Sequence, residues 1–124
     1  MLTSSRMNGF VPTKDAKKAR EFYEGVLGLT FVSDNPYVAV FHSGPSMIIM
    51  QKMGKEFAPV HFTILGWEVD DIEKVVSFLS KRGVAFMKGI QGLEQDALGI
   101  WKSPDGKVAW FKDPDGNTLS VSQH

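Results

Sequence analysis

The chain has 124 residues, of which 43% are apolar and 11% aromatic, which is the length of one domain with enough apolar surface for a buried core. Fourteen basic residues balance fourteen acidic ones, so the charge points to neither a nucleic-acid nor an anionic-membrane partner. The absence of cysteine excludes disulfide bonds, thiolate metal ligands and a cysteine nucleophile.

The first predicted elements are a strand at about residues 4–11 and an amphipathic helix after it. Thr13 can cap the helix at its N-terminus, and Gly28 can end it in the left-handed conformation. Between these two residues, apolar side chains recur at helical spacing, namely Ala16, Ala19, Phe22, Tyr23, Val26 and Leu27. The pattern predicts a helix with one buried face.

Short segments rich in β-branched and aromatic residues follow, separated by turn sequences such as Asn35-Pro36 and Ser43-Gly44-Pro45. These segments predict strands at about residues 29–34, 37–42, 46–53 and 60–68. Between the last two, Gly54 to Pro59 is the plausible boundary between two halves of the chain.

A second helix is predicted after this boundary, with Asp70 as its N-cap and Glu73 as the capping-box partner three residues later. Its apolar stripe consists of Ile72, Val75, Val76 and Leu79, and Lys81, Arg82 and Gly83 mark its end. Further strands are predicted at about residues 84–88, 98–102, 107–112 and 117–122.

The second half of the chain repeats the first in a weak form. Residues 13–31 align with residues 69–86, and one constant offset matches Asp15 with Asp71, Lys18 with Lys74 and Phe22 with Phe78. Both halves are therefore expected to share one supersecondary plan. The space between two such halves is a natural place for a small ligand.

No segment is typical of a membrane or secreted protein. The N-terminal residues MLTSSRMNGF lack the apolar core of a signal peptide, and apolar runs such as Met47 to Met50 are too short to span a bilayer. We therefore expect a cytoplasmic protein without a membrane partner.

Three stretches together resemble one family. They are REFYEGVLGLTF, GWEVDDIEKVVSFLSKRGV and FKDPDGNTLSVSQ, and their order and spacing are similar to those of the vicinal oxygen chelate superfamily, which includes glyoxalase I, extradiol dioxygenases and bleomycin-resistance proteins. The resemblance implies an α+β fold in which two βαβββ modules form a curled mixed sheet around a cleft. It also implies one domain over residues 1–124, with modules at about 1–54 and 60–124, and a homodimer.

In the metal-dependent members of that superfamily, the ligands come from four strands. The matching positions here hold Asn8, Met50 (or Gln51 if the register slips by one), Ile64 and Ser120. None is the His, Glu or Asp that a divalent ion prefers, so we expect no catalytic metal and no other cofactor. His61 lies three residues before Ile64, and period-two alternation puts it on the opposite face unless the strand contains a bulge.

The same positions and their neighbours on alternating residues define a predicted ligand pocket with an apolar and aromatic wall. Its candidate residues are Arg6, Asn8, Phe10, Met50, Phe62, Ile64, Trp101, Trp110 and Ser120. Trp110 is expected directly across from Ser120. Several of them also have a structural reading: Trp101 and Trp110 suit a core or a dimer interface, Phe62 a core, Arg6 a surface ion pair, and Met50 a filler between strands.

No nucleophile with an adjacent base, glycine-rich phosphate loop or catalytic carboxylate pair is visible, so no catalytic residue is predicted. The leading hypothesis is a metal-free protein that binds a small molecule, perhaps an aromatic compound or antibiotic. The first alternative is a lyase, isomerase or dioxygenase of the same superfamily, with or without a metal. The second is a relic that persists as a dimer or accessory subunit with its pocket filled. Whether the cleft is formed within one chain or across a dimer is left open.

Overall fold

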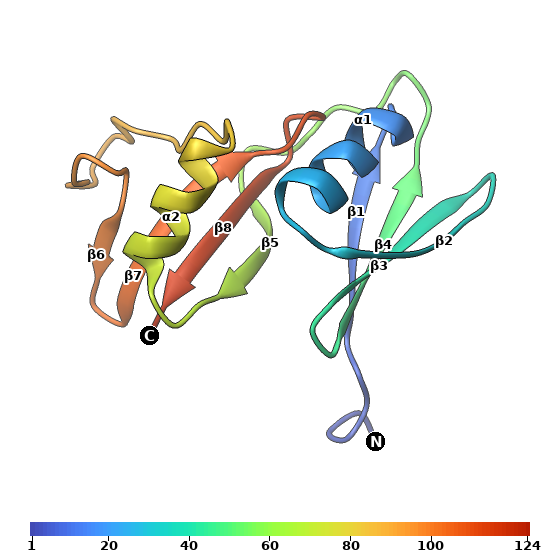
Figure 1. The fold of residues 1–124 in the computed structure, drawn as a ribbon, viewed down its shortest axis with the longest axis horizontal. Coiled ribbons are helices and arrows are strands. Elements are labelled where there is room, and N and C mark those ends of the chain that lie inside the picture. The colour runs from blue at the N-terminus through green and yellow to red at the C-terminus, as the bar shows by residue number, and fades with distance from the viewer. The chain divides into compact units, whose positions relative to one another are not determined.

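The computed structural model describes residues 1–124 and divides the chain into two compact units, Met1–Ala58 (unit 1) and Pro59–His124 (unit 2) (Figure 1). The division lies within the segment from Gly54 to Pro59 that the sequence singled out. Each unit has one strand, one helical segment and then three strands, so the predicted α+β fold with two βαβββ modules is confirmed.

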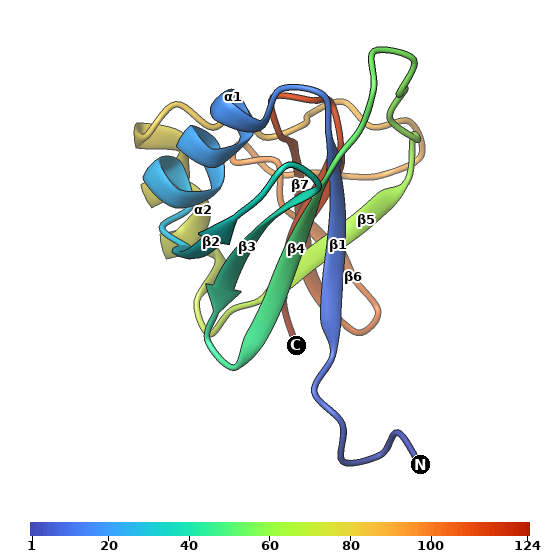
Figure 2. The same ribbon diagram turned by 90° about the vertical axis from the view of Figure 1, so that its right-hand side faces the viewer.

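Unit 1 is a four-stranded mixed sheet with one helical segment. Its elements are β1 (Asn8–Thr13), α1 (Ala16–Arg20), the π-helix η1 (Glu21–Val26), β2 (Thr30–Asp34), β3 (Val38–Ser43) and β4 (Ser46–Lys52). The strand order is β1-β4-β3-β2, with β1 parallel to β4 and the other pairs antiparallel (Figure 2). On one face, fully or nearly fully buried side chains pack together with Tyr23 of η1, whose ring lies 6.3 Å from that of Phe41.

The helix of unit 1 begins later than predicted. Asp15, and not Thr13, is the N-cap, because its carboxylate accepts a hydrogen bond from the Lys18 N–H at 3.2 Å. Thr13 instead ends β1 and accepts a hydrogen bond from the Asp15 N–H. After α1 the turns widen into η1, where the Leu27 N–H bonds to the Phe22 carbonyl five residues earlier.

Unit 2 repeats this plan with a longer helix. Its elements are β5 (Thr63–Glu68), α2 (Ile72–Lys81), β6 (Trp101–Ser103), β7 (Gly106–Lys112) and β8 (Thr118–Gln123). The strand order is β5-β8-β7-β6, with β5 parallel to β8 (Figure 1). Ile72, Val76 and Leu79 of α2 are buried, as are Ala109, Phe111, Leu119 and Val121 of the sheet. No helix of the chain has the length and apolar character needed to cross a membrane.

The strand predicted at residues 84–88 forms only one bridge, between Phe86 and Phe111, followed by a hydrogen bond from the Met87 N–H to the Trp110 carbonyl. The chain then turns away at Gly89, which has a φ of +69° that most residues avoid. Regular pairing therefore ends there, and residues 87–100 form an irregular segment between α2 and β6, with one further bridge between Gln95 and Trp101.

The N-cap of α2 is Asp71, one residue later than the predicted Asp70, because the Asp71 carboxylate accepts from the Lys74 N–H at 3.2 Å. Two further bonds tie the helix to the sheet. The Gln123 side chain accepts from the Ile72 N–H, and the Lys107 ammonium donates to the Glu73 carboxylate at 2.6 Å. That second bond lowers the pKa of Glu73 and raises the pKa of Lys107.

The cap assignment can be tested with two neighbouring aspartates. Asp71→Ala should lower the free energy of unfolding by about 1 kcal/mol, because the Lys74 N–H loses its acceptor. Asp70→Ala, the matched control, should change it by less than about 0.5 kcal/mol, as surface substitutions do. Urea unfolding of the two variants measures both values, and a larger loss for Asp70→Ala would place the cap at the predicted residue instead.

Candidate functional site

One face of the unit 2 sheet is not covered by α2, and the candidate site lies on it. Side chains alternate along each strand, so the residues between the buried ones of β7 and β8 point to this side. They are Val108, Trp110, Thr118, Ser120 and Ser122, and the pairing of Trp110 with Ser120 is as predicted. We call this surface the open face of unit 2.

A β-bulge in β5 decides which residues of that strand reach the open face. Thr63 pairs with Thr118 and Leu65 with Leu119, so Ile64 is an extra residue between two consecutive pairs. Thr63 and, three residues later, Gly66 both lie on the open face, beside Thr118 and Ser120. Ile64, the predicted site residue, lies in the bulge and does not line the groove described below.

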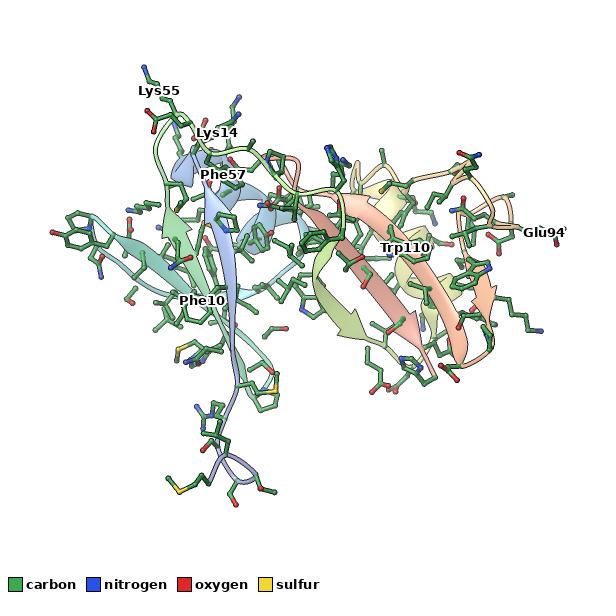
Figure 3. All side chains as sticks on the ribbon, turned by 180° about the vertical axis from the view of Figure 1, so that it is seen from behind. Phe10, Lys14, Lys55, Phe57, Glu94 and Trp110 are labelled. Atoms are coloured by element: carbon green, nitrogen blue, oxygen red, sulfur yellow. The ribbon has the colours of Figure 1, made fainter.

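Trp110 is held in one orientation on this face. Its indole Nε1 donates a hydrogen bond to the Thr63 hydroxyl at 3.0 Å. Its ring also stacks on Trp101 of β6, with 6.1 Å between the ring centroids and 27° between the planes. Figure 3 views unit 2 from the side opposite α2 and shows Trp110 on the strands. An aromatic surface fixed at two points is ready for a ligand, because little side-chain freedom is lost on binding.

Beside Trp110, the row of paired residues continues to Ser120 and Gly66. A Cβ atom at residue 66 would lie only 2.5 Å from the Ser120 hydroxyl oxygen, so glycine leaves this hydroxyl its room. The hydroxyl has no hydrogen-bond partner within the protein. The indole of Trp110 therefore lies beside the Ser120 hydroxyl, which can donate and accept hydrogen bonds.

A groove of about 260 Å³ opens at one end of this face. It is lined by His61, Phe62, Thr63, Met87, Ile90, Leu93, Trp110 and Thr118. Three of these residues come from the irregular segment after α2, and the others come from β5, β7 and β8 and the residues that lead into β5. Apolar side chains predominate, and His61 is the one titratable group among them.

His61 lines the groove, a position that the sequence allowed only if the strand contains a bulge. The bulge is present at Ile64, but His61 precedes β5, and His61, Phe62 and Thr63 all line the groove, so alternation along a strand does not decide its side. The sequence named a bulge as the condition for this position, but the tendency of Thr63 and Ile64 to form one is not visible in their residue types. Met87, Ile90 and Leu93 were also missed, because they follow no periodic pattern.

The site residues predicted in unit 1 are placed as follows. Asn8 and Phe10 lie on the face of β1 that faces away from Val11 and its buried neighbours, and Phe10 is 50% exposed (Figure 3). Met50 pairs with Val11 and is completely buried, so its side chain does not reach that face; Gln51, the alternative, does. Arg6 lies before β1 and is exposed.

The side chains at the four positions that hold metal ligands in the metal-dependent members can now be compared with the needs of a divalent ion. The matching positions present an asparagine and a glutamine in unit 1, and a serine, a threonine and a glycine on the open face of unit 2. No group of three or more His, Cys, Asp or Glu side chains in the chain could hold a metal ion. The donor set therefore does not fit a catalytic metal.

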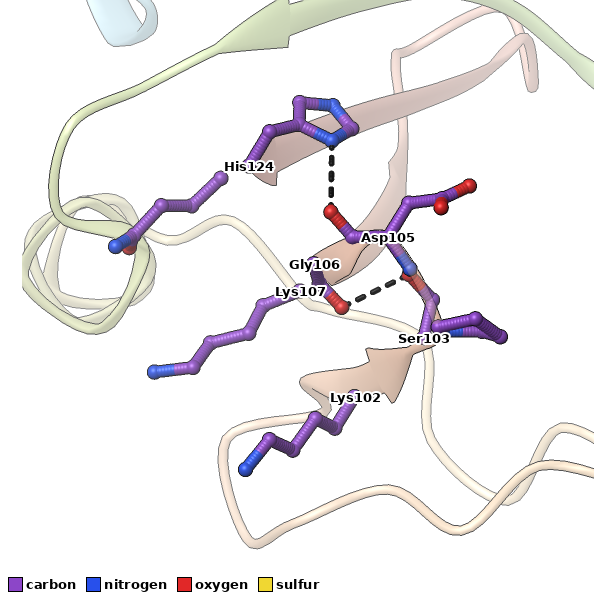
Figure 4. Close-up of a pocket in the computed structure, with 8 residues that line it drawn as sticks. Lys102, Ser103, Asp105, Gly106, Lys107 and His124 are labelled. Atoms are coloured by element: carbon purple, nitrogen blue, oxygen red, sulfur yellow. Dashed lines mark hydrogen bonds between the residues drawn. The ribbon is translucent and has the colours of Figure 1, made fainter.

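A second cavity, of about 360 Å³, lies at the turn between β6 and β7 (Figure 4). The Ser103 hydroxyl donates to the Gly106 carbonyl at 2.8 Å, and a ring nitrogen of His124 lies 3.2 Å from the Asp105 carbonyl oxygen. The charged end of Lys107 is engaged by Glu73. This cavity contains no aromatic wall, and its polar groups largely satisfy one another.

Comparison with known proteins adds two findings. A family model described as the Glyoxalase/Bleomycin resistance protein/Dioxygenase superfamily matches residues 6–121. No curated protein matches the sequence.

Among solved structures, the chain is similar to TnmS3, an antibiotic binding protein from Streptomyces sp. CB03234, with 25% identity, a TM-score of 0.74 and coverage of 99% of this chain and 98% of that one. It is similar to an integron cassette protein from V. cholerae at 26% identity, with a TM-score of 0.67 and coverage of 100% and 98%. A lactoylglutathione lyase from Agrobacterium tumefaciens is 16% identical, with a TM-score of 0.75 and coverage of 99% and 96%, and shows the shared fold alone.

The hydrogen bond that orients Trp110 can be measured by a double-mutant cycle. Thr63→Val and Trp110→Phe should show a coupling of about 1 kcal/mol in urea unfolding, the value of a typical protein hydrogen bond. Ser122→Ala combined with Trp110→Phe is the control and should show almost none, since Ser122 lies on the same face without a bond to the indole. Equal coupling in both cycles would mean that Thr63 does not hold the ring.

Proposed function

Because the chain belongs to the Glyoxalase/Bleomycin resistance protein/Dioxygenase superfamily, as its three motifs predicted, we propose that it is a binding protein of this fold that takes a small aromatic ligand without a metal ion. The observation that carries the proposal is the groove beside Trp110, with its apolar lining and the free hydroxyl of Ser120 next to it. Apolar walls with a few placed polar groups are typical of small-molecule sites.

The fixed indole of Trp110 favours an aromatic ligand. Flat rings pack against one another in offset or edge-to-face arrangements, and such contacts add about 0.5–1.5 kcal/mol to the burial of apolar area. Phe62, which is 67% exposed at the groove, offers a second ring. A ligand held between these rings gains contacts that an aliphatic molecule of the same size lacks.

The size of the groove favours a ligand fragment of one or two rings. Its volume of about 260 Å³ lies just below the ~300–1,000 Å³ typical of pockets for drug-sized molecules. Ser120 does not line the groove itself, but a hydroxyl or carbonyl on a ligand that extends past Trp110 along the open face can bond to its hydroxyl. The similarity to TnmS3, an antibiotic binding protein, supports a ligand of this general kind.

The residues of the groove support binding in preference to catalysis. General acid–base catalysis needs groups positioned within hydrogen-bond reach of a reacting atom, often with a partner that tunes or orients them. His61 is the one such group here, and no carboxylate lines the groove with it. The donor set also does not fit a divalent ion.

Two exposed phenylalanines of unit 2 provide a matched test. Phe62→Ala should weaken the binding of 2-naphthol by about fivefold, which corresponds to roughly 1 kcal/mol of aromatic contact. Phe78→Ala, at a side chain of α2 that is 57% exposed and does not line the groove, should leave the affinity unchanged. Isothermal titration of both variants and the unaltered protein gives the comparison. An unaltered protein without affinity for one- and two-ring aromatic compounds would refute the proposal.

The alternative function is an enzyme of the same superfamily, and the position of His61 in the groove is the observation in its favour. Elemental analysis of the purified protein, after incubation with manganese, iron, nickel or zinc and desalting, distinguishes the two. We expect no retained metal beyond the level of a chelator-treated sample. Near-stoichiometric retention that is lost in His61→Ala would move the assignment to a metal-dependent enzyme.

A further inference from the structure

The irregular segment after α2 forms one wall of the groove, and the Gln95 side chain bonds to the backbone of two of the wall residues, Met87 and Ile90. We propose that Gln95 is a positioning residue that fixes this wall and thereby limits the size of the ligand that the groove accepts. The inference rests on the proposed function, since it concerns the same groove. Gln95 itself does not line the groove.

The side-chain amide of Gln95 makes three hydrogen bonds to backbone groups of the segment. Its Nε2 donates to the Met87 carbonyl at 2.8 Å and to the Gly99 carbonyl at 2.9 Å, and its Oε1 accepts from the Ile90 N–H at 2.9 Å. One side chain thus joins both ends of the segment and its middle.

These bonds act directly on the residues that form the wall. Met87 and Ile90, whose backbone groups bond to Gln95, both line the groove, as does Leu93. On the sheet side, the Met87 N–H bonds to the carbonyl of Trp110, the opposite wall. The wall is therefore held to the sheet by the Met87 bond to β7 and by the backbone bridge from Gln95 to Trp101 of β6, and the amide of Gln95 fixes Met87 and Ile90 relative to each other.

The segment can change its backbone conformation when the Gln95 amide is removed, because it contains two glycines and little regular structure. Gly89 and Gly92 have φ values of +69° and +85°, and the segment from Lys88 to Ala97 belongs to no strand or helix. Asp96, next in the chain, stabilises only the following turn, where its carboxylate accepts from the Leu98 and Ile100 N–H groups. No other side chain bonds to the backbone of both Met87 and Ile90.

The test compares two fluorescent probes of different size, 2-naphthol with two rings and 1-hydroxypyrene with four. In Gln95→Glu, a carboxylate of the same shape loses both donor hydrogens and faces two carbonyl oxygens, so the wall is released. The ratio of the two dissociation constants should shift by about tenfold toward the larger probe, the low end of what pocket shape contributes to discrimination. Gln95→Met, which removes the bonds without adding charge, should shift it in the same direction.

Charge is controlled by the neighbouring residue. Glu94 is exposed and lies at the outer end of the segment (Figure 3), and Glu94→Gln alone should leave the ratio unchanged. The double variant Glu94→Gln/Gln95→Glu has the net charge of the unaltered protein and should behave as Gln95→Glu does. Circular dichroism confirms folding, and Gln95→Met provides the comparison if the Glu variants do not fold.

The outcomes separate the inference from the proposed function. If the unaltered protein binds 2-naphthol and the ratio is the same in all Gln95 variants, or if both affinities fall by one common factor, the size-limiting role is wrong and the binding function stands. If the unaltered protein binds neither probe, the proposed function fails and the inference with it.

Discussion

One helical segment can cover only one face of a four-stranded sheet, and this constraint organises both units. In unit 1 the covered face packs against Tyr23, and in unit 2 it packs against the buried stripe of α2. Because side chains alternate along a strand, every residue that contributes to a core leaves its neighbours on the other face. The open face of unit 2 is thus a direct product of core formation, and it displays Trp110, Ser120 and Thr118 in adjacent positions.

The bulge in β5 adds the second element of the site. One extra residue, Ile64, shifts the alternation at the start of the strand so that Thr63 meets the indole of Trp110. A regular strand would place Thr63 on the face that α2 covers. The orientation of the aromatic wall therefore follows from this local irregularity.

Sequence patterns predicted most of the fold, because hydrophobic periodicity and turn residues act locally. They located both helices, the last two strands and the pairing of Trp110 with Ser120. They failed where the outcome depends on tertiary contacts. Asp70 and Asp71 are chemically alike, so only the backbone conformation identifies the cap. In β4, a register shift of one residue places Gln51, and not Met50, on the face away from the core of unit 1. The wall from Met87 to Leu93 shows no periodic pattern of apolar residues. Hydrogen bonds between the Gln95 side chain and the backbone of Met87 and Ile90 stabilise it instead.

The two helix caps bear on the origin of the chain. Asp15 and Asp71 share a φ of −142°, differ by only a few degrees in ψ, and each accepts from the N–H of a lysine three residues later at 3.2 Å. Serine, threonine or asparagine would serve as well at either position, so the shared aspartates are not dictated by helix chemistry. Duplication and fusion of a half-length gene leaves such a pattern. All three tryptophans lie in unit 2, so the two units differ in their aromatic residues while their caps are alike.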